Sequence, residues 1–427
     1  MKTVRRVLLV IVSLAVLAAV VLVAFPTIAL RPTLAHWRAG GYPSLSVAIA
    51  NECGVVWSAA AGAADLRAGR EARTSDLYGV GSITKTVVAV VALQLADEGR
   101  IDLARSATDY VPRLRDMQIP NAGTATLAQL MNHTSGIPSW EDDPRWIREA
   151  RGAAVDPHRP WQPADSLAYV DGKQALSPPG AEYHYSNTNY TLLGLAIEAV
   201  TGESLGSEIK RRILVPLGLQ DTYLEGDQGA PPNRLARRYH FDTPVFRATA
   251  GVAPSFTTAR PGLLDVSDAS LAPEWAAGGL VTTAHDLATF ALALRDGRLL
   301  TRKQLAFMQT WRPAEDGLQV GHGLFRFDRG NGRYTLGHQG SVLGFAAQME
   351  WLEKGDAVLV SLSNVGSIDA GEVPLDRHAA LPFVLATFTY LASAKATACL
   401  LSPRHNKATS PHGARNDRVG HIAANTP

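Results

Sequence analysis

The chain has 427 residues, of which 46% are hydrophobic, and it carries a formal net charge of +2. The positive charge is concentrated at the ends. Lys2, Arg5 and Arg6 lie at the start, and segment 402–427 holds four basic residues and one acidic residue, so the body between them has a net charge of −4. A mildly acidic body argues against a nucleic acid as partner, and the length allows one large two-lobed unit or two domains.

An apolar run of 19 residues, Val7–Phe25, follows the first basic residues and is interrupted only by Ser13. This length lies between that of a signal-peptide core and that of a membrane-spanning helix, and Thr27-Ile28-Ala29 would be a weak cleavage site. We predict that residues 1–30 form an uncleaved membrane anchor, with a cleaved signal peptide as the alternative. In both cases the body is exported, either held on the extracytoplasmic side of the cell membrane or secreted or periplasmic.

A β-hairpin is predicted next, with strands at Leu45–Ala50 and Val55–Ala61 joined by the turn Asn51–Gly54. Cys53 lies in that turn, and the second cysteine, Cys399, lies near the end of the chain. The two could pair in an exported protein, but neither lies in a motif typical of a cysteine nucleophile. We expect them to be free or incidental, and their pairing stays open.

The stretch Gly81–Lys85 opens an apolar run that continues to Leu95 and stops at Gly99. The run is too long for a strand, so it predicts a helix buried on nearly every face. Ser82 would lie in the first turn, with Lys85 three residues on and on the same face. A desolvated lysine can take the proton of a serine nucleophile, and the free N–H groups of a first turn can stabilise an oxyanion.

The segment from Asn121 to about Ala314 is mainly helical in pattern, with long connections rich in proline and glycine. Strand-like runs return at the spacing of an antiparallel meander; they are Arg333–Gly337, Gly344–Leu352 and Ala357–Asn364. The pattern predicts an α+β fold, in which an antiparallel sheet built from both chain ends is flanked by helices and a mainly helical lobe is inserted. A helix at about 378–394 is too short to span a membrane, and the polar tail 401–427 is predicted to be disordered.

Two further clusters carry polar groups that suit a site. The loop Pro178–Asn187 contains Tyr185 and leads into an apolar helix, and Gly337–Ser341 places His338 in or beside a strand. Taken singly, each has an ordinary structural explanation. The first fits a half-buried tyrosine and a helix N-cap, and the second fits a strand edge with a glycine bulge.

Taken together and in order, Ser82-x-x-Lys85, Tyr185-x-Asn187 and His338-x-Gly340 resemble the three signatures of the serine β-lactamase and penicillin-recognising family. The resemblance covers about residues 43–364. It includes three longer stretches that are similar to recurrent family sequence; they are Leu130–Pro138, Val215–Thr222 and Ala277–Thr283. It implies a β-lactamase/transpeptidase-like fold and one serine hydrolase domain at residues 31–400.

The resemblance also implies acyl transfer. Ser82 would attack a carbonyl and form an acyl-enzyme, with Lys85 and Tyr185 jointly handling its proton. Asn187 would bind Lys85 and the amide carbonyl of the substrate. The backbone N–H groups of Ser82 and Ser341 would form the oxyanion hole. Neither a metal nor a cofactor is implied.

One position departs from many β-lactamases, which carry Lys-Thr-Gly where this chain has His338-Gln339-Gly340. A lysine there supplies a fixed positive charge for a substrate carboxylate, whereas an unperturbed histidine is charged only below about pH 6.5. No acidic residue stands out as a separate deacylation base. The sequence therefore favours a peptidase or esterase acting on a small-molecule or peptidoglycan-type peptide substrate over an efficient β-lactamase.

Three alternatives accompany this prediction. Gly202–Gly206 fits the Gly-x-Ser-x-Gly nucleophile elbow, but it follows an apolar helix rather than a strand, so Ser204 is expected to be a helix N-cap. Ser207 and Lys210 repeat the Ser-x-x-Lys spacing, but two arginines follow, which is typical of a solvated helix face. From a different functional class, a penicillin-binding or sensing module would be acylated slowly with little turnover.

Overall fold

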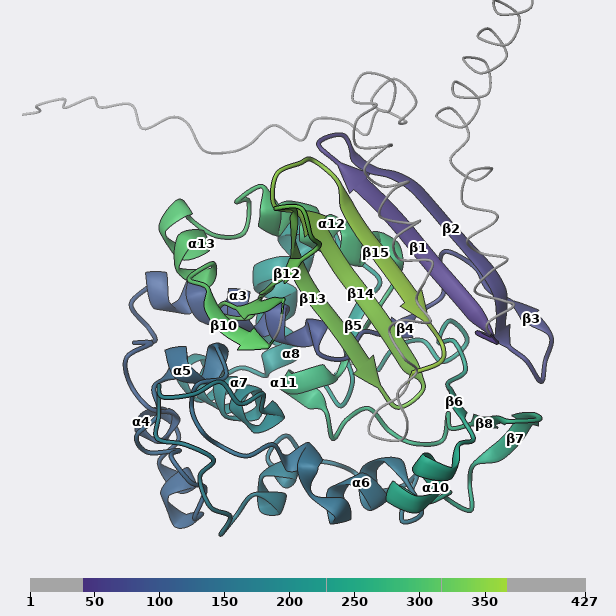
Figure 1. The fold of residues 1–427 in the computed structure, drawn as a ribbon, viewed down its shortest axis with the longest axis horizontal. Helices are drawn as coiled ribbons and strands as arrows, with labels where there is room; N and C mark the ends of the chain where they lie inside the picture. Colours follow the sequence, from purple (N-terminus) through teal and green to yellow (C-terminus); the bar gives the residue numbers. More distant parts are fainter. Residues whose placement is uncertain (1–40, 228, 316, 367–427) are drawn as a thin grey trace, which may run out of the picture.

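The computed structural model describes residues 41–227, 229–315 and 317–366 (Figure 1). Three predictions lie outside the described residues: the N-terminal segment 1–30, the helix at about 378–394 and the tail 401–427. Within the described part of the chain, no helix is both long and apolar enough to cross a membrane. The membrane anchor and the export of the body therefore stay predictions.

One antiparallel sheet of nine strands joins the two ends of the described chain (Figure 1). β1 (Ser44–Asn51) pairs with β2 (Gly54–Asp65) on one side and with β15 (Val358–Ser363) on the other. β15 pairs in turn with β14 (Phe345–Leu352), which pairs with β13 (Tyr334–Val342). The predicted hairpin, the predicted meander and a sheet built from both chain ends are all confirmed.

The sheet extends further than the sequence predicted. Its order is β10–β11–β12–β13–β14–β15–β1–β2–β3, with β3 at Arg70–Glu71, β10 at Arg312–Glu315, β11 at Leu318–Val320 and β12 at Phe325–Asp328. The prediction that the helical region reaches about Ala314 is wrong for its last residues, because β10 begins at Arg312. β10 is four residues long and mostly exposed, so no alternation of apolar and polar residues marks it in the sequence.

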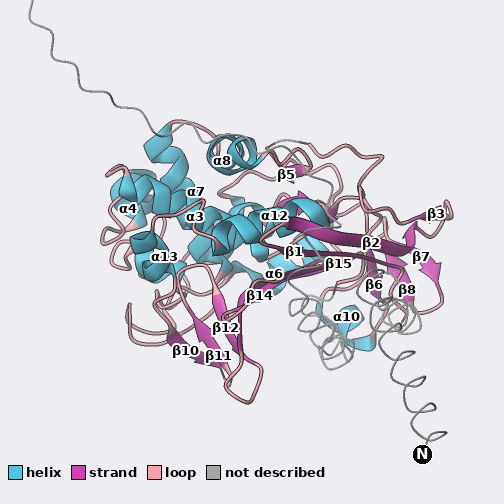
Figure 2. Ribbon diagram, turned by 90° about the horizontal axis from the view of Figure 1, so that it is seen from above, coloured by secondary structure: helices cyan, strands magenta, loops and turns pink. Residues whose placement is uncertain are grey.

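Helices make up most of the lobe between β3 and β10, and Figure 2 shows them gathered mainly beside the strands of the large sheet. They are α3 (Ile83–Asp97), α4 (Ala107–Tyr110), α5 (Leu127–Met131), α6 (Pro144–Arg151), α7 (Asn187–Thr201), α8 (Leu205–Ile209), α9 (Val215–Leu217), α10 (Pro244–Thr249), α11 (Trp275–Gly278), α12 (Ala284–Arg295) and α13 (Arg302–Met308). Short 3₁₀ helices lie at Pro112–Asp116, Trp140–Asp142 and Asp165–Tyr169, and a π-helical turn lies at Lys210–Leu214.

The lobe also contains two small three-stranded sheets that the sequence did not predict. Their strands, in spatial order, are β4 (Tyr78–Gly79), β9 (Leu280–Thr282) and β5 (Thr222–Leu224), and β6 (Tyr239–Phe241), β8 (Leu263–Asp265) and β7 (Thr257–Arg260). Each strand has at most four residues, which is too short for a periodic signal.

α3 is the central helix of the core, as predicted. Twelve of its fifteen residues are buried. It contacts β13 and β14 of the large sheet and also α7, α8 and α11, so apolar residues are needed on nearly every face. α12 packs against β1, β2, β14 and β15. The α+β architecture is confirmed, and it brings the start of α3 against β13 and α7.

Cys53 forms a disulfide, which corrects the expectation of a free or incidental cysteine. The turn that holds Cys53 has the predicted place between β1 and β2. Cys399 lies outside the described residues.

Candidate active site

Ser82 lies at the N-cap of α3, and Lys85 lies in its first turn. The side chain of Ser82 makes no capping hydrogen bond, so its hydroxyl is left for other partners. Because residues three apart share one face of a helix, Lys85 Nζ lies 2.9 Å from Ser82 Oγ. The predicted pair is therefore brought together by the local geometry of the helix.

Lys85 is fully buried and has three hydrogen-bond partners. Its Nζ lies 2.9 Å from Ser82 Oγ, 2.6 Å from Asn187 Oδ1 and 2.7 Å from the carbonyl oxygen of Ala277. Burial lowers the pKa of Lys85 from 10.5 to about 7, although the carboxylates of Glu141 and Glu274 act in the opposite direction. Near neutral pH a large share of Lys85 is thus an uncharged amine, which can accept a proton from Ser82.

Tyr185 approaches Ser82 from the loop before α7. Its hydroxyl donates a hydrogen bond of 2.7 Å to Ser82 Oγ, and burial raises the pKa of Tyr185 well above 10. The ring stacks on His133 with ring centroids 4.3 Å apart. His133 is itself fixed, since its Nδ1 accepts a hydrogen bond of 3.1 Å from the backbone N–H of Ser186. Tyr185 is therefore a protonated donor held in one orientation.

β13 approaches the start of α3 so closely that only glycine fits at two positions. A Cβ atom on Gly340 would lie 1.9 Å from the carbonyl oxygen of Val80 and 2.9 Å from the backbone nitrogen of Ser82. A Cβ atom on Gly81 would lie 2.6 Å from the backbone nitrogen of Ser341, and Gly81 also has φ +50°. The two backbone N–H groups predicted to bind an oxyanion therefore come from adjoining segments.

His338 is on β13, where its surroundings lower its pKa below that of an unperturbed histidine. It is buried, and its Nδ1–H donates to the carbonyl oxygen of Gln339 at 2.5 Å. Burial, together with the nearby Lys85, lowers the pKa of His338 to about 3. This value lies below the 6.5 that applies to an unperturbed histidine. His338 is neutral at physiological pH, and its Nε2 has no hydrogen-bond partner.

Asn187 lies between Lys85 and a carboxylate that sequence reasoning missed. Its Oδ1 accepts from Lys85, and its Nδ2 donates to Glu141. Glu141 also pairs with Arg151 at 2.6 Å, and Arg151 pairs with Glu274. Nothing local marks these residues, because they lie on three separate segments; the sole signal is that Glu141 follows closely on the stretch Leu130–Pro138.

The competing serines lie in ordinary structural positions. Ser204 is the N-cap of α8 and accepts a hydrogen bond of 3.2 Å from the backbone N–H of Ser207. The turn that holds Ser204 follows α7 rather than a strand, so the structure does not form a nucleophile elbow. Lys210 is exposed at the start of the π-helical turn, unlike the buried Lys85.

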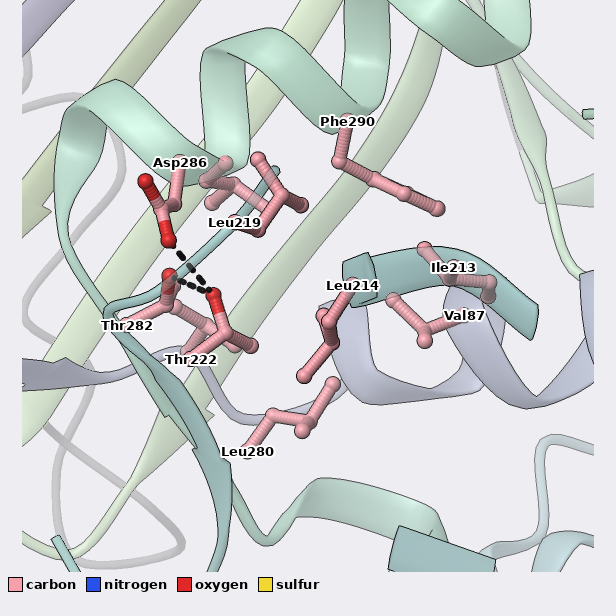
Figure 3. Close-up of a pocket in the computed structure, with 11 residues that line it drawn as sticks. Val87, Ile213, Leu214, Leu219, Thr222, Leu280, Thr282, Asp286 and Phe290 are labelled. Atoms are coloured by element: carbon pink, nitrogen blue, oxygen red, sulfur yellow. Dashed lines mark hydrogen bonds between the residues drawn. The ribbon is translucent and has the colours of Figure 1, made fainter. Parts of the chain in front are cut away.

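A small cavity of about 20 Å³ lies between α3, α12 and β9, and none of the predicted site residues lines it (Figure 3). Its polar groups bond one another. Thr222 Oγ1 lies 2.7 Å from Thr282 Oγ1 and donates to Asp286 Oδ2 at 3.2 Å. We interpret this cavity as a packing void behind the site.

A buried lysine beside a partly exposed serine and tyrosine, at the meeting point of a central helix, a helical lobe and an antiparallel sheet, is the arrangement of a penicillin-recognising serine centre. Residues 30–381 match the family described as Beta-lactamase. The chain belongs to this family, and the family recognised in the sequence is confirmed.

Three known proteins illustrate the similarity. Esterase EstB from Burkholderia gladioli is 29% identical over 202 residues, which cover 44% of this chain and 48% of that protein. The structure of a D-stereospecific amidohydrolase from Streptomyces sp. is 30% identical, with a TM-score of 0.69, and the match covers 84% of this chain and 98% of that one. The structure of a D-amino acid amidase from Ochrobactrum anthropi SV3 has a TM-score of 0.74 over 87% of this chain and 99% of that one; at 24% identity it supports the fold alone.

The chain spans about half the length, or less, of the curated relatives that it matches. The names of these relatives and structures agree with the predicted serine hydrolase.

Proposed function

We propose that the protein is a serine hydrolase that cleaves an ester or amide through an acyl-enzyme on Ser82. One observation carries the proposal: Ser82 Oγ lies 2.9 Å from an amine whose pKa is lowered to about 7 and 2.7 Å from a protonated tyrosine hydroxyl. A hydroxyl placed between a base and a proton donor is the arrangement that nucleophilic catalysis requires.

The arrangement supports the following steps. Neutral Lys85 takes the proton of Ser82 as Oγ attacks the substrate carbonyl, and the backbone N–H groups of Ser82 and Ser341 stabilise the oxyanion. When the tetrahedral intermediate collapses, Tyr185 gives a proton to the leaving alcohol or amine and regains one from Lys85. Water then attacks the acyl-enzyme as Lys85 takes its proton. The bond between the acyl carbon and Ser82 Oγ breaks, Oγ regains a proton from the Lys85 and Tyr185 pair, and the free acid leaves. The raised pKa of Tyr185 supports Lys85 as the base in this proposal.

The charge of the site favours a substrate without a carboxylate beside the reacting carbonyl. His338 is neutral, with a pKa of about 3, so this position supplies no cation, and Glu141 adds a negative charge near Asn187. Two of the similar proteins are named an esterase and a D-stereospecific amidohydrolase. We therefore propose small neutral or amine-bearing esters and amides, D-amino-acid derivatives among them, as the substrate class.

The test is a panel of substrates with the full-length chain in detergent. It comprises a short-chain aryl ester, a D-amino acid anilide, a D-alanyl-D-alanine peptide and a chromogenic cephalosporin. We expect turnover of the first two, lost in Ser82→Ala and kept in the matched control Ser204→Ala. A single slow acylation by the cephalosporin with no turnover of any substrate would instead indicate the penicillin-binding or sensing module.

We also propose that the protein is held at the membrane with its catalytic domain on the extracytoplasmic side. The proposal is supported by the apolar run Val7–Phe25 behind Lys2, Arg5 and Arg6. Fractionation of cells that make the full chain tests it, because the activity should sediment with membranes and be removed by a protease added outside. A soluble exported product that begins near Leu30 would instead support the cleaved signal peptide.

A further inference from the structure

Arg151, the last residue of α6, is a buried arginine that joins two carboxylates beside the candidate site. Only 3% of its side chain is exposed. Its Nη1 donates to Glu141 at 2.6 Å, and its Nε donates to Glu274 at 3.1 Å. The guanidinium also lies over the ring of Trp146, 4.4 Å from the centroid. Its position is therefore fixed by charge and by packing.

One route leads from Arg151 through Glu141 to Lys85. Glu141 accepts from Nδ2 of Asn187, which orients the amide so that Oδ1 faces Lys85 Nζ at 2.6 Å. Without the carboxylate, nothing in these contacts would stop the amide from turning and presenting its NH₂ group to Lys85. Arg151 holds the carboxylate that sets this orientation.

A second route leads through Glu274 to the same amine. Glu274 is the N-cap of α11, and its carbonyl oxygen accepts from the backbone N–H of Ala277 at 2.8 Å. The carbonyl oxygen of Ala277 in turn accepts from Lys85 at 2.7 Å. Because α11 has only four residues, the anchoring of its N-cap Glu274 by Arg151 also fixes the carbonyl of Ala277 within the same short helix.

We propose that Arg151 is a positioning residue for the base of the reaction, because it fixes two of the three hydrogen-bond partners of Lys85 through Glu141 and Glu274. This inference rests on the proposed function, in which Lys85 activates Ser82. Arg151 itself touches neither Ser82 nor Lys85 in the contacts above, so its effect passes through the two carboxylates.

The electrostatic consequence has a definite sign. Lys85 is faced by Glu141 and Glu274, by Arg151 itself, and by four groups that are neutral at physiological pH: Tyr185, Tyr190, His133 and His338. The arginine opposes the ammonium form of Lys85, and each carboxylate favours it. Burial raises the pKa of Glu274, and Arg151 opposes that rise. Over the pH range in which both carboxylates are ionised, loss of Arg151 should therefore shift the protonation of Lys85 to higher pH, whereas loss of the charge of Glu274 should shift it to lower pH.

The experiment measures the rate at which a fluorophosphonate labels Ser82 in the full-length chain from pH 5 to pH 10. In wild type the labelling rate should fall as pH drops below about 7, the value to which burial lowers the pKa of Lys85, and we call this fall the acid limb. Arg151→Met should move this limb to higher pH, and Glu274→Gln should move it to lower pH. Arg151→Lys should restore part of the wild-type profile, and Arg148→Met, an exposed arginine on the same helix, should leave it unchanged.

Opposite shifts in Arg151→Met and Glu274→Gln support the proposal, because a purely structural loss would lower the rate at every pH without moving the limb. An unmoved limb in both variants, or shifts of the same sign, would overturn it. If Arg151→Met does not fold, the double variant Arg151→Met/Glu274→Gln, which removes one charge of each sign, is compared with Glu274→Gln alone. The labelling limb of the double variant should lie at higher pH than that of Glu274→Gln, and an identical limb in the two variants would overturn the proposal. If wild-type Ser82 is not labelled at all, the proposed function has failed instead.

Discussion

The buried Lys85 should make the stability of the protein depend on pH in a way that Lys85→Met abolishes. Burial lowers the pKa of this lysine from 10.5 to about 7 in the folded chain. The unfolded chain therefore binds the extra proton throughout this window, and the folded wild type gains stability as pH rises from about 7 to 10.5. Below pH 7 Lys85 is charged in both states, and burial of this charge lowers the free energy of unfolding by about 5 kcal/mol.

The clearest quantity is the difference in the free energy of unfolding between wild type and Lys85→Met. Between pH 6 and pH 9 wild type should gain about 3 kcal/mol relative to the variant. The pH dependence of the groups whose pKa Lys85 does not influence cancels in this comparison. The lost hydrogen bonds to Asn187 and Ala277 shift the difference by a constant amount, so they do not affect its slope.

Urea unfolding at several pH values, followed by tryptophan fluorescence, measures the difference. Lys303→Met, at an exposed lysine on α13, is the control and should differ from wild type by the same small amount at each pH. A Lys85→Met difference that does not change with pH would refute the reasoning, since Lys85 would then be protonated to the same extent in the folded and unfolded chains.

Three further variants test single contacts of the site. Tyr185→Phe keeps the stack on His133 but removes the hydroxyl, so kcat should fall by about 10²–10⁴-fold with KM little changed, as steady-state kinetics would record; an unchanged kcat would remove Tyr185 from the mechanism. Gly340→Ala would place a Cβ atom 1.9 Å from the carbonyl oxygen of Val80, so β13 must shift and kcat should fall by about 10²–10³-fold. The control Gly229→Ala, at a position with open space around it, should leave kcat unchanged. Equal activity of the two variants would contradict the tight fit of β13 against α3. His338→Lys adds the cation that the neutral histidine lacks and should shift the kcat/KM ratio towards a cephalosporin over a neutral ester by about tenfold; an unchanged ratio would show that this position does not select against carboxylates.

The central helix and the sheet could be predicted because their signals are local. The run after Lys85 is apolar at almost every position, which fits a helix surrounded by other elements. The sequence runs that form β1, β14 and β15 are long enough to be recognised as strands. The three short motifs define a site only when they are taken together, and their adjacency follows from a fold that places β13 and the start of α7 against the start of α3.

The remaining features depend on contacts between distant segments. The network of Glu141, Arg151 and Glu274 joins residues up to 133 positions apart, so no spacing in the sequence reveals it. The pKa of His338 could not be predicted from the sequence because it is set by burial and by Lys85, neither of which a motif records. The strands of the small sheets have too few residues for a periodic pattern.

The central claim is that Ser82 is the nucleophile, and covalent labelling tests it most directly. Separate samples of the full-length chain are treated with a fluorophosphonate or with a penicillin-type probe, and the labelled peptide is identified by mass spectrometry. We predict an adduct on Ser82, absent from Ser82→Ala and unaffected by Ser204→Ala. Label on Ser204, Ser207 or any other serine, with Ser82→Ala labelled as well as wild type, would contradict the account.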